Sequence, residues 1–255
     1  MARVRTAAQA AKWIDKAGIA LLFPKADVVL TSLWEAVNGD RSTQWAVRDA
    51  DGAFLGWTEE MGIVWGLKDE LPDRRLACVG KHLAGVATCI APRALPALYS
   101  LTGRPGRPED FRGEAEGLEL AVCEAVLDAG PLTAPALRDA VGAVKKDVDR
   151  AVLRLQRRLV LTNAGVVEQD RGWGAIAVDL LARRFELGPL PAEAEARRQL
   201  VGYVLAAATE VTAADVAGAL GWRRKQAEAV LDEVAVSRDE DGFRVWKRDS
   251  GRPGK

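Results

Sequence analysis

The stretches Leu132-Thr-Ala-Pro-Ala-Leu-Arg-Asp-Ala-Val-Gly142 and Val211-Thr-Ala-Ala-Asp-Val-Ala-Gly-Ala-Leu-Gly221 follow one pattern at an offset of 79 residues. In each copy a threonine, Thr133 or Thr212, stands at the N-cap position of a short helix. The glycine that closes each copy suits the end of that helix, because glycine adopts positive φ without strain. The pattern continues at helical spacing beyond both glycines, which indicates a repeated structural unit.

Each copy predicts the same order of elements. An apolar helix precedes the quoted stretch (118–126 and 200–205), and a third helix follows it (144–158 and 223–234). Short β segments come next, with turns expected at Asn163–Gly165 and at 239–242. Three helices and a hairpin are typical of a winged-helix unit. The prediction is a mainly α protein with small β wings, built from tandem winged-helix domains; a generic pair of alanine-rich helices is the alternative.

Proline and glycine divide the chain. Gly103-Arg-Pro-Gly-Arg-Pro108 is expected to be a linker, and Gly188-Pro-Leu-Pro191 marks a second boundary. Residues 1–103 then form a tryptophan-rich, mostly helical domain, and whether it is itself a winged helix stays open. Winged-helix domains are predicted over 109–190 and 191–247, followed by a disordered tail over 248–255.

The first section has clear helix signals. Helices are expected from Thr6, after the capping box at Ser32 and Glu35, and from Thr58. Pro72 suits the first turn of a further helix over 73–83, and a short strand is expected over 85–90.

The third helix of the first copy has the charge pattern of a DNA-reading helix. From 145 to 158 it carries six basic and two acidic residues. The basic residues are Lys145, Lys146, Arg150, Arg154, Arg157 and Arg158. Four of them recur at helical spacing opposite an apolar face, so they can meet phosphates or guanine edges. A solvated helix face is the alternative.

The second copy is less basic. Arg223, Arg224 and Lys225 cluster at the start of its third helix, where the helix dipole favours phosphate. Plain surface charge explains them equally well. The acidic residues at 239–241 should repel DNA from this second wing.

Two groups in the first section have two interpretations. The charged residues Lys68, Arg74, Arg75, Lys81 and His82 either line a groove for an anion or form a solvated ion-pair surface. The indoles of Trp34 and Trp65 either stack on bases or belong to the core.

Composition excludes several functions. The 36 basic and 36 acidic residues cancel, so no strongly basic arm exists. The single histidine and three cysteines without CxxC spacing argue against a metal site or disulfides, and no cofactor motif is present. The start does not read as a signal peptide, and no apolar run suits a membrane span. These features favour a cytoplasmic protein without a cofactor, a metal or a membrane partner.

Three segments resemble a known family. They are Trp13-Ile-Asp-Lys-Ala-Gly-Ile-Ala-Leu-Leu-Phe-Pro24, Ser32-Leu-Trp-Glu-Ala-Val-Asn-Gly39 and Trp65-Gly-Leu-Lys-Asp-Glu-Leu-Pro-Asp-Arg-Arg75. Together with 172–185 they are similar to actinobacterial proteins related to the AlkZ/YcaQ DNA glycosylases. The resemblance implies tandem winged helices, duplex DNA as partner, a place on the nucleoid and a role in DNA repair.

The resemblance does not carry over a catalytic residue. The glycosylases use a Gln–apolar–Gln or Gln–apolar–Asp motif, whereas the corresponding Leu22-Phe-Pro-Lys-Ala-Asp27 has no glutamine. Gln44-Trp45-Ala46 matches only the first two positions. Asp27 and Glu35 are the nearest carboxylates and are the catalytic candidates. The chain is therefore predicted to bind duplex DNA, with base excision left open; a transcriptional regulator and a protein–protein adaptor are the alternatives.

Overall fold

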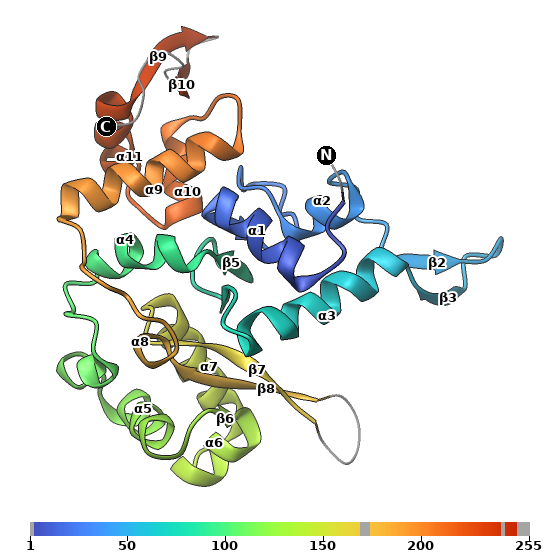
Figure 1. Ribbon diagram of the computed structural model, residues 1–255, viewed down its shortest axis with the longest axis vertical. Coiled ribbons are helices and arrows are strands. Elements are labelled where there is room, and N and C mark those ends of the chain that lie inside the picture. The colour runs from blue at the N-terminus through green and yellow to red at the C-terminus, as the bar shows by residue number, and fades with distance from the viewer. Residues whose placement is uncertain (1–2, 169–173, 241–242, 249–255) are drawn as a thin grey trace.

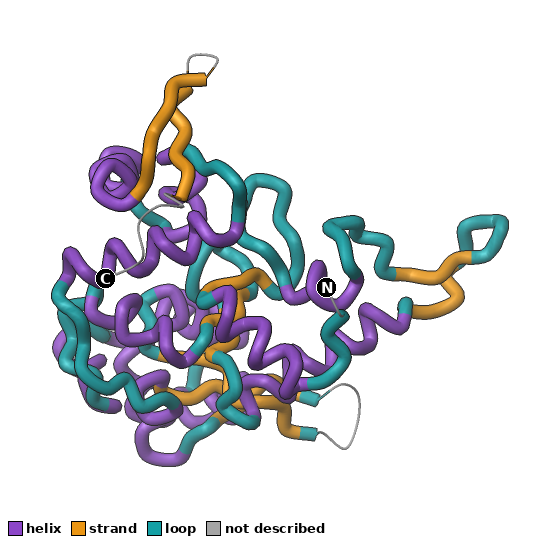
Figure 2. The backbone as a smooth tube through the Cα atoms, turned by 45° about the horizontal axis from the view of Figure 1, so that its top comes forward, coloured by secondary structure: helices purple, strands orange, loops and turns teal. Residues whose placement is uncertain are grey.

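The computed structural model describes residues 3–168, 174–240 and 243–248, and within them the protein is mainly helical with four small antiparallel sheets (Figures 1 and 2). This confirms the coarse part of the predicted fold class, mainly α with small β elements. The predicted tail over 248–255 lies outside the described residues except for Arg248.

The first section runs from α1 (Ala7–Ala17) to α4 (Leu95–Ser100). Its other elements are β1 (Ile19–Leu21), α2 (Leu33–Asn38), β2 (Ala46–Arg48), β3 (Phe54–Trp57), α3 (Glu59–Asp73), β4 (Cys78–Gly80), β5 (Thr88–Ile90) and the 3-10 turn η1 (Pro92–Ala94). The three helix starts expected from the sequence are confirmed: the side chains of Thr6, Ser32 and Thr58 each accept a hydrogen bond from the N–H three residues on.

The helix predicted over 73–83 is wrong. Pro72 lies in the last turn of α3, and β4 occupies Cys78–Gly80. The residues from Ala77 to Val79 are fully buried, and β4 pairs with β5 in register. Burial of this apolar run between neighbouring elements therefore outweighs the helix-start signal of a proline.

The second section contains the first predicted copy. Its elements are the 3-10 turn η2 (Pro108–Gly113), α5 (Gly117–Ala129), β6 (Leu132–Thr133), α6 (Ala134–Val141), α7 (Lys145–Arg157), β7 (Leu161–Val167), β8 (Ala175–Leu180) and α8 (Leu181–Arg184). Thr133 caps α6, and Gly142 ends it at φ +63°, as expected.

The hairpin turn predicted at Asn163–Gly165 is wrong. These residues lie inside β7, at an irregularity in its pairing with β8. Gly165 has φ +106°, and a Cβ there would come within 2.9 Å of the Asp73 side chain at the end of α3. The glycine thus allows α3 to approach β7 closely. The end of the hairpin between β7 and β8 falls on 169–173, outside the described residues.

The third section repeats the helices at the predicted offset. It consists of α9 (Glu193–Ala207), α10 (Ala213–Leu220), α11 (Arg224–Val234), β9 (Ala235–Glu240) and β10 (Phe243–Arg248). Thr212 and Asp215 form the expected capping box, and Gly221 ends α10 at φ +72°. The second wing's two strands are confirmed, whereas its tip at 241–242 lies outside the described residues.

Sheet topology extends the repeat to the first section. There, the order of strands is β1-β5-β4, and in the second section it is β6-β8-β7. In both, a short strand after the first helix pairs with the last strand of the unit. The third section keeps a remnant of this pairing, a single antiparallel bridge between Val211 and Trp246. All three sections therefore share one element order.

Two hydrophobic cores underlie the three sections. The larger one combines side chains of the first and third sections with four of the second, Leu159, Leu181, Phe185 and Leu187. The smaller one lies entirely within the second section. Helices α4 and α9 pack together across the larger core. The approach is close at Gly18, where a Cβ would come within 2.2 Å of the Tyr203 ring.

The segment 103–108 is packed rather than exposed at Arg104. This side chain is only 5% exposed, and its guanidinium lies 4.7 Å from the Tyr99 ring centre. It also donates a hydrogen bond to the carbonyl oxygen of Arg158. The arginine thus links the end of the first section to the second section, which the Pro and Gly content of the segment did not reveal.

Candidate nucleic-acid interface

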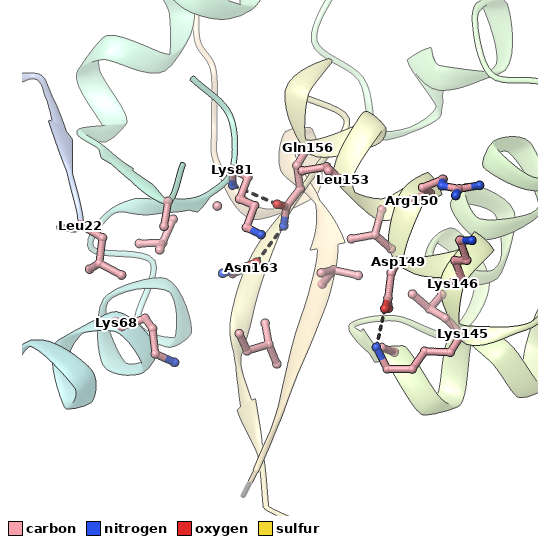
Figure 3. Close-up of a pocket in the computed structure, with 18 residues that line it drawn as sticks. Leu22, Lys68, Lys81, Lys145, Lys146, Asp149, Arg150, Leu153, Gln156 and Asn163 are labelled. Atoms are coloured by element: carbon pink, nitrogen blue, oxygen red, sulfur yellow. Dashed lines mark hydrogen bonds and ion pairs between the residues drawn. The ribbon is translucent and has the colours of Figure 1, made fainter. Parts of the chain in front are cut away.

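A cavity of about 900 Å³ opens between the first and second sections (Figure 3). Its lining comes from both: α3, β4 and the residues near them on one wall, and α6, α7, β7 and β8 on the other. The lining residues are Leu22, Lys68, Val79, Gly80, Lys81, Ala87, Ala134, Leu137, Lys145, Lys146, Asp149, Arg150, Val152, Leu153, Gln156, Asn163, Ile176 and Val178. We call this cavity the cationic groove, because five of its side chains are basic and one is acidic.

The basic side chains stand on opposite walls. Lys68 and Lys81 belong to the first section, whereas Lys145, Lys146 and Arg150 stand on the first two turns of α7. The Lys145 ammonium pairs with Asp149, the single carboxylate of the lining. The groove therefore presents an excess of positive charge from two directions.

The basic side chains differ in how far they are already paired within the protein. Lys68 is paired with Asp69 and lies 4.7 Å from the Trp65 ring centre. Arg150 has an exposed ion pair with Asp147 at 3.6 Å, which contributes little in water. Among the described residues, Lys146 makes no ion pair. Lys146 and Arg150 are thus the two α7 cations most available to an anionic ligand.

A polar seam joins the two walls at the base of the groove. The Gln156 side chain accepts a hydrogen bond from the Lys81 backbone N–H at 2.9 Å and donates one to the Asn163 side chain at 2.8 Å. His82 Nδ1 donates to the Gln156 carbonyl oxygen at 2.8 Å, and Thr162 Oγ1 donates to the Val79 carbonyl oxygen at 3.1 Å. These bonds fix α7 and β7 against the β4–β5 region.

His82 is part of this seam and is neutral. Because Nδ1 donates to a carbonyl, Nε2 carries no proton and faces Cys78 Sγ at 3.3 Å. Burial lowers the pKa of His82 to about 4 and raises the pKa of the Cys78 thiol to about 12. The pair has the spacing of a thiol–imidazole dyad, but these protonation states make it structural.

The predicted row of cations on α7 divides into two groups. Lys145, Lys146 and Arg150 line the groove. Arg154 instead pairs with Glu119 of α5, and Arg158 contacts Glu119 and Glu114 at 2.9 Å each. Arg157 is exposed but does not line the groove. Helical spacing placed the basic residues on one side, but it did not show that acidic residues at and just before α5 bind the last turns of α7.

Arg223, Arg224 and Lys225 lie elsewhere. They are exposed at the start of α11, in the third section, and none lines the groove. In Figure 1, α11 lies in the upper part of the molecule and α7 in the lower part. The structure therefore does not bring the two predicted basic clusters together. It does bring Lys68 and Lys81 to the groove, which the anion-groove interpretation anticipated, without Arg74, Arg75 or His82.

The two carboxylates nearest the missing motif are also outside the groove. The Asp27 side chain is 72% exposed and pairs with Lys25 at 3.2 Å. Glu35 accepts hydrogen bonds from the Ser32 N–H and hydroxyl, each at 2.7 Å, and so completes the capping box of α2. The Trp34 indole is fully buried and packs against the rings of Phe23 and Trp45. It therefore belongs to the core.

A capping role for Glu35 predicts a stability effect. Glu35→Ala should lower the free energy of unfolding by about 1 kcal/mol, because it removes one half of the capping box. Asp27→Ala should change it by less than about 0.5 kcal/mol, since that side chain is exposed. Urea unfolding of both variants measures this, and equal stabilities would contradict the assignment.

The part of the chain that the structure describes contains neither a candidate membrane span nor a candidate metal centre. None of the helices in the described ranges has both the length and the apolar character needed to cross a bilayer. Within the same ranges, no group of three His, Cys, Asp or Glu side chains is placed to hold a metal ion.

Comparison with known proteins identifies the family. No curated protein matches the chain. No solved structure matches it either. The model of the family described as AlkZ related matches residues 4–221, which include all of the first two sections and the third as far as the end of α10. The chain therefore belongs to the AlkZ-related family.

Proposed function

We propose that the protein binds duplex DNA in the cationic groove. The observation that carries the proposal is the charge of its lining, five cations from two walls against the single carboxylate Asp149. A duplex offers phosphates on both sides of each of its grooves, so cations that approach from two directions can neutralise both. A polyanion is the ligand class that this arrangement favours.

The repeated element order supports duplex DNA over other polyanions. We interpret the units α5–β8 and α9–β10 as the predicted tandem winged-helix domains, and the first section as a third such unit. In a winged helix the third helix commonly enters the major groove. Here that helix is α7, and its first two turns carry Lys145, Lys146 and Arg150 into the groove lining. We likewise propose that the boundaries between these domains lie at 103–109 and 190–191.

We further propose that the groove binds DNA without base excision. Excision of a base needs a group that holds or activates water. The only carboxylate of the lining is paired with Lys145, and Leu22 stands where the related glycosylases are expected to begin their motif. Asp27 and Glu35 lie outside the groove. A repair role would then consist of recognising DNA rather than cutting a glycosidic bond, and DNA binding would place the protein on the nucleoid.

The experiment that tests this proposal compares three duplexes: plain, with an abasic site, and with an N-alkylated purine. We expect binding to all three, weakening with salt by a log–log slope of about 4 to 5 if all five cations meet phosphates. Release of the alkylated base, measured by chromatography, should stay at the uncatalysed level. Release above that level would overturn the absence of excision.

The other possible outcomes of this experiment distinguish the alternative functions. A preference for one sequence would favour a transcriptional regulator, and a preference for the lesions would favour a repair role. No measurable binding at low salt would overturn the DNA proposal and favour an adaptor between proteins.

A further inference from the structure

The hairpin of β2 and β3 stands apart from the body of the protein. It is inserted between α2 and α3, a connection that in the second section takes only residues 142–144. We call residues 46–57 the arm. In both Figure 1 and Figure 2 the arm projects away from the remaining elements. The connection between α2 and α3 thus contains a separate β-hairpin.

The arm is held firmly at its base and closed at its tip. Trp45 stacks on Phe23 and Trp34, with ring centres 4.7 and 5.7 Å apart, and its carbonyl accepts the Thr58 N–H at 3.0 Å. At the tip, the Asp49 carboxylate accepts two backbone N–H groups of the turn at 3.0 and 2.8 Å. These contacts indicate a folded element with a defined orientation.

The arm is unusually apolar for a projecting element. The exposed fractions are 47% for Val47, 52% for Phe54, 64% for Leu55 and 58% for Trp57. The rings of Phe54 and Trp57 lie 5.2 Å apart and pack on each other rather than on the body. A two-stranded hairpin is marginally stable alone in water, and exposed apolar clusters mark interaction sites. The arm therefore has the properties of a surface that is covered in the working protein.

Its backbone and charges indicate what covers it. Within the described residues, β2 and β3 form a sheet of two strands, so each has an open edge able to pair with another strand. Apart from Asp49, whose carboxylate closes the turn, the charged residues of the arm are Arg48 and Asp51, one of each sign. Two arms in antiparallel orientation can therefore place opposite charges against each other. A phosphate backbone would instead meet two acidic residues at the tip.

We propose that the arm joins two copies of this chain. The arms of the two copies pair about a twofold axis, which buries Phe54, Leu55 and Trp57 of both and continues the hydrogen-bonded sheet from one copy into the other. Such an interface is self-complementary, as a twofold dimer requires. If the groove binds DNA as proposed above, the dimer presents two grooves related by symmetry, but the pairing itself needs no DNA.

The first test is the mass of the protein in solution without DNA. Light scattering after size-exclusion chromatography should give a dimer for the full chain at tens of micromolar concentration. Phe54→Ser/Trp57→Ser should give a monomer. The matched control Val144→Ser/Val167→Ser also removes two exposed apolar side chains, 66% and 50% exposed, but away from the arm, and should remain a dimer. A monomeric wild type, or a dimer that survives the arm substitutions, would overturn the proposal.

The second test locates the contact. The three native cysteines are buried, so Ala53→Cys introduces a single accessible thiol near the tip of the arm. A short bismaleimide should convert Ala53→Cys into a covalent dimer, and the added Phe54→Ser/Trp57→Ser substitutions should abolish that product. A cross-link that is unaffected by those substitutions would contradict arm pairing. Weaker DNA binding by the arm variant with an unchanged mass would also overturn it, and would assign the arm to DNA.

Discussion

Lys146→Glu/Arg150→Glu is expected to lower the affinity for duplex DNA at least about tenfold and to flatten the log–log salt dependence by about two units. Both side chains line the cationic groove and are exposed on α7. The substitutions replace two attractive charges with two repulsive ones, so the loss combines missing phosphate contacts with repulsion. Fluorescence anisotropy of a labelled duplex at several salt concentrations measures both quantities.

The matched control makes the same change of charge outside the groove. Arg223→Glu/Arg224→Glu alters two exposed cations at the start of α11, far from the groove lining. It should leave affinity within about twofold of wild type, apart from long-range electrostatics that salt screens. Equal losses in both variants would contradict the assignment of DNA binding to the groove. Melting curves should be unchanged, because Val148 and the rest of the buried face of α7 are untouched.

Acidification from about pH 6.5 to pH 4 is expected to remove about 3 kcal/mol of folding stability through His82. Burial lowers the pKa of this histidine from 6.5 in the unfolded chain to about 4 in the folded protein. Between these values the unfolded chain takes up a proton that the folded protein does not. The contribution is therefore complete above pH 6.5, is lost as the pH falls towards 4, and changes little below that.

Urea unfolding at closely spaced pH values checks this expectation against His82→Gln. The variant keeps a polar side chain but cannot titrate, so it should be less stable at pH 7 and lose about 3 kcal/mol less between pH 6.5 and 4. Carboxylates titrate in the same range in both proteins, and the difference between the two curves removes their contribution. Parallel curves would contradict a neutral, buried His82. The Cys78 thiol contributes nothing to the difference, because its pKa of about 12 keeps it protonated throughout.

Local signals predicted several of the helix ends. The caps at Thr133, Thr212 and Ser32 depend on residues three positions apart, so the sequence alone contains them. The failures arose where distant segments meet. Gly165 has the composition of a turn but lies within β7, because the end of α3 leaves no room for a side chain there. Nothing near Gly165 in the sequence reports that contact.

The arm is absent from the sequence predictions although a local signal for it exists. Asp51-Gly52 between apolar residues is a recognised hairpin signal. The groove was predicted in part, because helical spacing places Lys146 and Arg150 together. Their opposition to Lys68 and Lys81 depends on how the first two sections pack, which no spacing rule contains.

The division of the hydrophobic cores has a consequence for how the protein is made. The larger core takes side chains from the beginning of the chain, such as Ile14 and Trp34, and from α9–α11 at its end. During synthesis the first section leaves the ribosome before α9 exists to cover α4, whereas all side chains of the smaller core come from the second section itself. A nascent chain that stops near residue 190 therefore contains every side chain of the smaller core but lacks the part of the larger core that α9–α11 supply. Products truncated near residue 190 would therefore be exposed to aggregation or proteolysis at the apolar surface of the first section that α9 covers in the folded protein.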